Sequence, residues 1–355
     1  MKTILLFSFA LLLTGLCAFT FATTSIGTSN VDNLVNSVAA DVEKLANQVA
    51  FSDDGKPYLT KEFTLNGDGN LHVETSGGNI TVVGGSGNQV KVEMFARLNG
   101  NRDSDKTEVK EELDKYDITI KQDGNTITAT AKRKASFRSQ RSHLSLSFSL
   151  YTPANMASQL ETSGGNISLA NLTGTQEAET SGGNITTENL KGNLSLETSG
   201  GNLTSTNVSG DVKMETSGGN IRLTKCHGKW NAQTSGGNID VTDAQGELKV
   251  ATSGGQINLK GMSGSLDART SGGGIEADIV ELGKYLTLET SGGSIEATIP
   301  GGKGLDLDLE GDRVKTTLNN FSGTSEKDRI VGKMNGGGIP VKMTTSGSTV
   351  VLNYR

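Results

Sequence analysis

The sequence is poor in the residue types on which most enzymes and disulfide-rich secreted domains depend. Its 355 residues include only 3 His, 2 Cys and 4 Pro, and 5% of them are aromatic. Few large side chains are therefore available for a wide globular core, and a metal or catalytic site built on clustered histidines is disfavoured. The formal net charge of −6 excludes a globally basic nucleic-acid-binding protein.

The N-terminal segment 1–22 has the pattern of a secretory signal peptide. Lys2 precedes an apolar run over residues 4–16, and small residues lead to a cleavage site after Ala22. The run is too short and too interrupted for a stable membrane span. We therefore expect an exported protein, at the cell surface, outside the cell or in the periplasm. Cleavage also removes Cys17, so Cys226 would be left without a disulfide partner.

Residues 23–50 form a second N-terminal segment with helical periodicity. Apolar residues recur there at steps of three and four, namely Val31, Leu34, Val35, Val38, Val42, Leu45 and Val49. This amphipathic helix either oligomerises the chain as a short coiled coil or covers the end of the following domain. The second interpretation is favoured, because two to three heptads are short for a coiled coil.

An internal repeat decides the architecture. The motif TSGG recurs with its threonine at positions 75, 162, 180, 198, 216, 234, 252, 270 and 290, and from Thr162 to Thr270 successive threonines are always 18 positions apart. A degenerate copy follows near Met334. Each unit is too short to bury its own apolar side chains, so the units must stack. The pattern predicts an all-β fold, a parallel β-helix (β-solenoid) with 18-residue coils, an N-terminal helix and a small α/β insertion.

Superposing the units at this period gives the columns expected to face inward. One column is Leu194, Val212, Trp230, Leu248 and Leu266, a second is Ala178, Leu196, Met214, Ala232, Val250 and Ala268, and a third is Leu172, Leu190, Val208, Cys226, Ala244 and Met262. At the Gly-Gly-Asn corner we expect glycines with positive φ. Inward Thr hydroxyls and Asn side chains should bond to equivalents one coil away and hold the register.

The repeat also sets the domain boundaries. We expect a first coil and N-terminal cap over 51–98, and an insertion over 99–150 with a helix at 106–115 and a β-hairpin turning at Asp123–Asn125. The β-solenoid repeats and C-terminal cap then occupy 151–355, and residues 342–355 are expected to be the closing strand.

On its serial T-S-G-G-x-I coils and its early insertion, the chain resembles the bacterial putative-adhesin families of unknown function over residues 60–355. The resemblance implies an exported envelope or surface protein with no assigned catalysis and no cofactor. Sequons such as Asn184-Ile-Thr fall within the stacked corners, where N-glycans would obstruct stacking, so export by a bacterium is expected.

The strongest candidate binding site is a run of basic residues in the insertion, which contains no acidic residue. Its members are Lys132, Arg133, Lys134, Arg138 and Arg141. They would bind an anionic polymer, or they are a solvated edge that prevents aggregation. Other charged groups are less specific. The repulsion within the outward column Glu161, Glu179, Glu197 and Glu215 is either relieved by solvent and by neighbours such as Lys213, or the column collects a cation or a basic ligand. Asp240, Asp243, Asp267 and Asp278 would be the carboxylates of a glycan-cleaving enzyme.

These observations favour a non-catalytic exported β-solenoid, an adhesin or cell-envelope interaction protein. Its partner would be a cell-surface or envelope polysaccharide or protein, with no nucleic acid and no cofactor. The alternative is an envelope ligand-binding or stress-response module for an anionic polymer, and a polysaccharide-degrading enzyme is the remote one.

Overall fold

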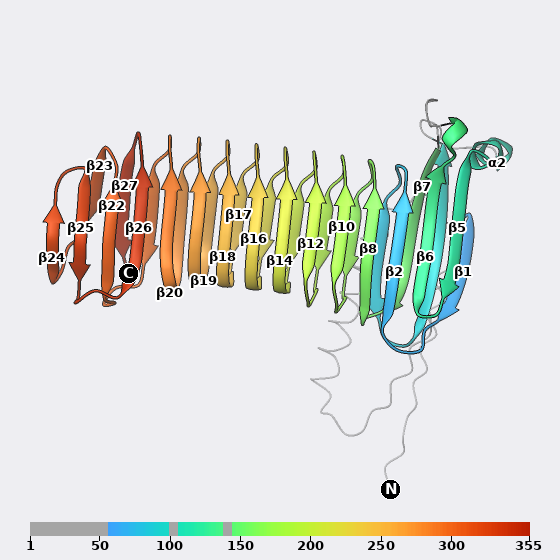
Figure 1. The fold of residues 1–355 in the computed structure, drawn as a ribbon, viewed down its shortest axis with the longest axis horizontal. Helices are drawn as coiled ribbons and strands as arrows, with labels where there is room; N and C mark the ends of the chain where they lie inside the picture. The colour runs from blue at the N-terminus through green and yellow to red at the C-terminus, as the bar shows by residue number, and fades with distance from the viewer. Residues whose placement is uncertain (1–55, 99–105, 138–143) are drawn as a thin grey trace, which may run out of the picture. The chain divides into compact units, whose positions relative to one another are not determined.

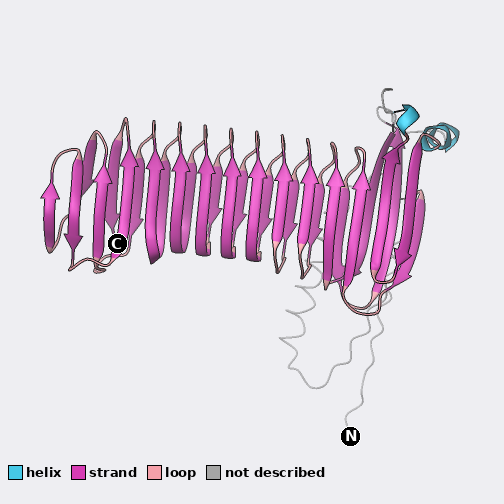
Figure 2. Ribbon diagram, in the orientation of Figure 1, coloured by secondary structure: helices cyan, strands magenta, loops and turns pink. Residues whose placement is uncertain are grey.

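The computed structural model describes residues 56–98, 106–137 and 144–355, all of them in one compact unit, Ser52–Arg355. The signal peptide and the amphipathic helix expected before residue 51 lie outside the described residues. The unit is almost entirely β-strand, as Figure 2 shows, and its strands follow one another in a continuous stack (Figure 1). The expected fold, a β-solenoid, is confirmed.

Each 18-residue coil supplies one strand to each of two facing sheets. The first sheet holds β8 (Met156–Thr162), β10 (Gln176–Thr180), β12 (Leu194–Thr198), β14 (Ser209–Thr216), β16 (His227–Thr234) and β18 (Gln245–Thr252). The second sheet holds β9 (Ile167–Ala170), β11 (Ile185–Glu188), β13 (Leu203–Thr206), β15 (Ile221–Thr224) and β17 (Ile239–Thr242). β19 (Ile257–Thr270) and β20 (Ile275–Thr290) run on from the second sheet into the first. Neighbouring coils pair in parallel and in register, as in Leu194↔Val212 and Leu203↔Ile221.

The alternation of apolar and polar residues explains why these segments form strands. In β12, Leu194, Leu196 and Thr198 are buried while Ser195 and Glu197 are exposed, because successive side chains of a strand point to opposite faces. All three inward columns expected from the repeat are buried, including Trp230 at 4% exposure and Cys226 at 1%. Apart from Trp230, these columns fill the narrow core between the sheets with small and medium side chains that stack on the equivalent residues of neighbouring coils.

The corner after each Thr needs glycine for a different reason from the one expected. The expected positive φ is wrong for the TSGG glycines: positive φ occurs instead at the opposite corner, for example at Asn189 and Gly192. The second TSGG glycine is required by close stacking, since a Cβ placed on Gly201 would lie 1.8 Å from the carbonyl oxygen of Gly183. The first glycine has room, with its nearest atom 3.8 Å from a Cβ on Gly200.

Hydrogen bonds between coils converge at the same corner. The Thr198 hydroxyl donates to the carbonyl oxygen of Gly183 at 2.8 Å and accepts from the amide of Gly201 at 3.2 Å. The threonines therefore bond to glycine carbonyls one coil away rather than to each other. The amide of Asn202 donates to Oδ1 of Asn184 at 2.7 Å, so the asparagine ladder runs from side chain to backbone.

The N-terminal side is closed by strands that precede the insertion together with strands that lie within it. They are β1 (Leu59–Thr64), β2 (Gly69–Thr75), β3 (Ile80–Gly85), β4 (Gln89–Leu98), β5 (Tyr116–Asp123), β6 (Thr126–Arg133) and β7 (Leu144–Pro153), with α2 (Lys106–Leu113) and the short 3-10 helix η1 (Ala135–Phe137). β2 lies between β8 and β6, and β3 lies between β9 and β7. The insertion thus adds a coil beyond the first TSGG coil, and β5 ends the first sheet while β1 ends the second.

The C-terminal side has the same arrangement, which corrects the expectation that the chain's last strand is the outermost one. The strands there are β21 (Ile295–Ile299), β22 (Leu305–Glu310), β23 (Arg313–Thr316), β24 (Phe321–Ser325), β25 (Arg329–Met334), β26 (Ile339–Thr345) and β27 (Thr349–Tyr354). β26 and β27 pair with β20 and β21, and the preceding segment lies beyond them. The first sheet therefore ends at β24 and the second at β23 (Figure 1).

Candidate functional site

The outer face of the first sheet carries a row of glutamates in strict register. Glu161, Glu179, Glu197 and Glu215 lie on adjacent strands as direct neighbours. Parallel strands are about 4.8 Å apart, so the carboxylates repel one another unless solvent or a cation screens them. Of these four glutamates, only Glu215 forms an ion pair with another described residue, Lys213, at 3.0 Å. We call these four residues the glutamate row.

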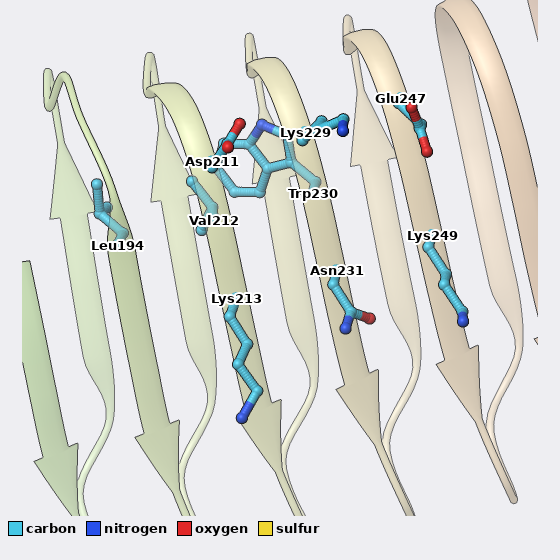
Figure 3. Close-up of a pocket in the computed structure, with 9 residues that line it drawn as sticks. All are labelled: Leu194, Asp211, Val212, Lys213, Lys229, Trp230, Asn231, Glu247 and Lys249. Carbon is cyan, nitrogen blue, oxygen red and sulfur yellow. The ribbon is translucent and has the colours of Figure 1, made fainter.

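Beside the glutamate row, a shallow depression of about 390 Å³ lies over β14, β16 and β18. Figure 3 shows the residues that line it. The Trp230 indole lies between two residues of β14, Asp211 and Val212, and Lys229, which is on the same strand as Trp230. Asp211, Lys229 and Glu247 lie side by side in one column, and Lys213, Asn231 and Lys249 in the next.

The charges around this depression are mixed, and its apolar lining consists of Leu194, Val212 and Trp230. Within the described part of the chain, Lys229 and Lys249 have no ion-pair partner within 4.0 Å. The indole nitrogen of Trp230 is buried and has no hydrogen-bond partner. The 18-residue columns could have revealed this cluster, because they align Lys213 with Lys249 and Asp211 with Lys229. The sequence prediction considered the inward columns and the outward glutamate column but not these two outward columns, and so missed the cluster.

The basic residues proposed from sequence lie only partly within the described structure. Lys132 and Arg133 end β6, Lys134 follows them, and Arg138 and Arg141 lie outside the described residues. The Lys132 ammonium, half exposed, forms an ion pair with Glu74 of the neighbouring strand β2. Lys134 Nζ donates to the backbone carbonyl of Asp114 at 2.7 Å. The basic run itself contains no acidic residue, but the fold brings Glu74, 58 positions before Lys132 in the sequence, beside it.

The carboxylates considered for glycan cleavage are not brought together. Asp267 lies on the first sheet, whereas Asp240 and Asp278 lie on the second. Each is held in an ion pair with an arginine, as in Arg269 Nε to Asp267 at 2.8 Å. His72 is 3.9 Å from Glu74, and His143 lies outside the described residues. None of the four aspartates lines the depression over Trp230, whose two carboxylates are Asp211 and Glu247.

Cys226 is a core residue with a suppressed thiolate. Burial raises its pKa to about 11, because the charged form would lose its hydration. In the described residues, no group of three or more His, Cys, Asp or Glu side chains could hold a metal ion. The described helices include none long and apolar enough to cross a membrane.

The family model described as Toastrack DUF4097 matches residues 68–247 and 244–352. Among solved structures, one described as a putative adhesin from Parabacteroides distasonis ATCC 8503 is similar at 12% identity and TM-score 0.36, over 84% of this chain and 98% of its own. A putative adhesin from Parabacteroides merdae ATCC 43184 is similar at 14% identity and TM-score 0.34, over 84% and 97%. A protein described as a putative lipid binding protein, also from P. distasonis ATCC 8503, is similar at 12% identity and TM-score 0.31, over 84% and 98%. No curated protein matches the chain.

Proposed function

The chain belongs to the Toastrack DUF4097 family, and we propose that it is an exported, non-catalytic β-solenoid that presents its repeated faces for adhesion or for contacts within the cell envelope. The observation that carries this proposal is the constancy of the coil. From Thr162 to Thr270 every coil has the same length, and the same outward positions recur on each strand.

Such a surface suits an extended partner with its own repeat. The glutamate row offers one carboxylate per strand, about 4.8 Å apart, and neighbouring columns add Ser, Lys and Asn side chains at the same spacing. Each contact is weak alone, but contacts made along one polymer act together, because the first raises the effective concentration for the next. The expected partners are a polysaccharide or a protein of the cell surface or envelope.

The experiment that tests export and display is protease accessibility on intact source cells, with an antibody against the solenoid and a lysed control. Loss of the antibody signal on intact cells supports a surface adhesin. Protection until lysis overturns the adhesin proposal and leaves contacts inside the envelope. Turnover on any member of a polysaccharide panel would contradict the non-catalytic assignment and favour a polysaccharide-degrading enzyme.

The second candidate function is that of an envelope ligand-binding or stress-response module that binds an anionic polymer. The exposure of Lys132, beside Arg133 and Lys134 at the end of β6, supports it. The partner Glu74 and the carbonyl of Asp114 reduce the charge available to a ligand there.

Binding to dextran sulfate tests this candidate. If the basic run is the site, binding weakens steeply with salt and is lost when Lys132, Arg133, Lys134, Arg138 and Arg141 are all replaced by Gln. The matched control replaces Lys213, Lys229 and Lys249 by Gln, which removes positive charge from the depression over Trp230. Loss of binding in the control alone would move the site to that depression.

A further inference from the structure

The two sheets have four edges, and β24 differs from the other three. An edge strand presents unpaired backbone groups that can pair with another strand, and proteins block such pairing with charged side chains, or by covering the edge. The four edge strands are β1, β5, β23 and β24.

Three of the edges carry charges and have outward backbone groups occupied. β1 contains Lys61 and Glu62, and its Thr64 carbonyl accepts a hydrogen bond from the Gln122 side chain. β5 contains two aspartates and one lysine, and its Ile120 carbonyl accepts from Lys61 Nζ at 2.7 Å.

The third edge, β23, carries Arg313 and Lys315. The amide of its Val314 donates to the carbonyl of Lys327 at 2.8 Å, so the turn after β24 covers part of this edge.

β24 has neither protection among the described residues. Its sequence, FSGTS, contains no charged residue and no proline, and four of its five residues are exposed. At the hairpin turn, the backbone amide of Glu326 donates a hydrogen bond to the carbonyl oxygen of Arg329. At the other end of the pair, the amide of Asn335 donates to the carbonyl oxygen of Asn320. Because antiparallel pairs alternate, the even-numbered residues of β24 bond to β25. The N–H and C=O groups of Phe321, Gly323 and Ser325 therefore point away from the sheet.

We propose that β24 is a self-association edge, which pairs antiparallel with β24 of a second copy about a two-fold axis at Gly323. In this register Phe321 of each copy faces Ser325 of the other, and Gly323 faces Gly323. All three outward residues then exchange both backbone hydrogen bonds with the partner strand. Pairing continues the first sheet from one copy into the next and extends the antiparallel order of β25 and β24.

A second copy fits this edge better than an unrelated strand, because the edge is complementary to itself. The two-fold places no like charges opposite each other within the strand. Gly323, on the axis, has no side chain of its own, and the Phe321 ring of the same copy lies where its Cβ would be. Phe321 is only partly buried in one copy, where its ring lies over Gly323 and Gly332, and it gains a neighbouring strand on its open side. A five-residue strand pair is small against ordinary stable interfaces, so the dimer is expected to be reversible and concentration-dependent.

The two-fold register makes a charge test possible. Ser322 and Thr324 are exposed residues whose side chains point to the outer face, and residue 322 of one copy lies directly opposite residue 324 of the other. The variant S322E/T324E therefore sets glutamates opposite each other twice in the dimer. Within its own chain, the glutamate introduced at position 322 would lie opposite Lys333, so β24 itself is not opposed by like charge. The variant S322E/T324K instead sets the new glutamate of each copy opposite the new lysine of the other.

Sedimentation velocity of the full chain over a range of concentrations measures the outcome. The unchanged chain is expected to dimerise, S322E/T324E to be monomeric at the same concentrations, and S322E/T324K to dimerise again. The control S195E/T242E, with the same charge change on two interior strands, should dimerise like the unchanged chain. Far-ultraviolet circular dichroism and Trp230 emission confirm that each variant is folded. A monomeric unchanged chain overturns the proposal, and so does a dimer that survives S322E/T324E, which would be held elsewhere, for example by residues 23–50.

Discussion

Replacing Gly201 by alanine should destabilise the solenoid strongly, whereas replacing the adjacent Gly200 should not. A Cβ on Gly201 would lie 1.8 Å from the Gly183 carbonyl oxygen, and real Cβ atoms essentially never come closer than 3.0 Å to such an atom. Neighbouring coils must then separate by about 1 Å at this corner. A Cβ on Gly200 meets nothing closer than 3.8 Å.

The size of the effect follows from what the separation breaks. Overpacking that shifts backbone costs about 1–3 kcal/mol. Two hydrogen bonds between these coils, from Thr198 to Gly183 and from Asn202 to Asn184, lengthen beyond useful range and cost about 1 kcal/mol each. The Gly201→Ala change should therefore lower the free energy of unfolding by about 3–5 kcal/mol. Gly200→Ala should change it by less than about 1 kcal/mol, because alanine also restricts the unfolded chain.

Urea unfolding of both variants, followed by circular dichroism and by Trp230 emission, measures the difference. The midpoint of Gly201→Ala should fall well below that of Gly200→Ala, at a similar dependence on urea. The pair Gly219→Ala and Gly218→Ala repeats the test one coil further, where the two distances are again 1.8 and 3.8 Å. Equal midpoints within each pair would refute the stacking explanation of the motif.

Three further predictions concern the core. Thr198→Val keeps the shape of the side chain but removes the bond to Gly183, so stability should fall by about 1–3 kcal/mol in the same urea assay, and an unchanged midpoint would contradict the bond. Because burial raises the pKa of Cys226 to about 11, the folded state favours the neutral thiol. The stabilisation that the buried neutral thiol contributes is complete below the ordinary thiol pKa and is lost as pH rises towards 11. Cys226→Ala should remove that part of the pH dependence of stability. Trp230, 4% exposed, should emit at short wavelength and resist iodide quenching, and red, quenchable emission would contradict its position in the core.

The interior coils could be predicted residue by residue, and the corner motif only in part. Strand alternation places Leu194 and Leu196 inward in any sheet, and the constant period aligns them with Val212 and Met214. The reason for the second glycine could not be seen from one unit. Positive φ and close approach both select glycine, and only the position of the neighbouring coil distinguishes them.

The candidate sites depend even more on long-range pairing. Lys132 is basic without a nearby acid in sequence, but β6 lies beside β2, which brings Glu74 to it. The depression over Trp230 arises because Lys213, Lys229 and Lys249 come from three successive coils. The regular column spacing could have identified these lysines. The partner of Lys132 could not have been identified, since no repeat relates β6 to β2.

The amino-acid sequence by itself determined the period, the inward columns and the parallel stacking of the interior coils. Each of these features recurs once per coil, so one local pattern, repeated, specifies them. The tertiary structure alone decided how the stack ends: β6 and β7 lie beyond the first coil, and β22 to β25 lie beyond the last strands of the chain. The physical reason is that an alternating strand can pair on either side with equal local geometry. Which neighbour it takes depends on chain connections and on the core that the whole stack must bury.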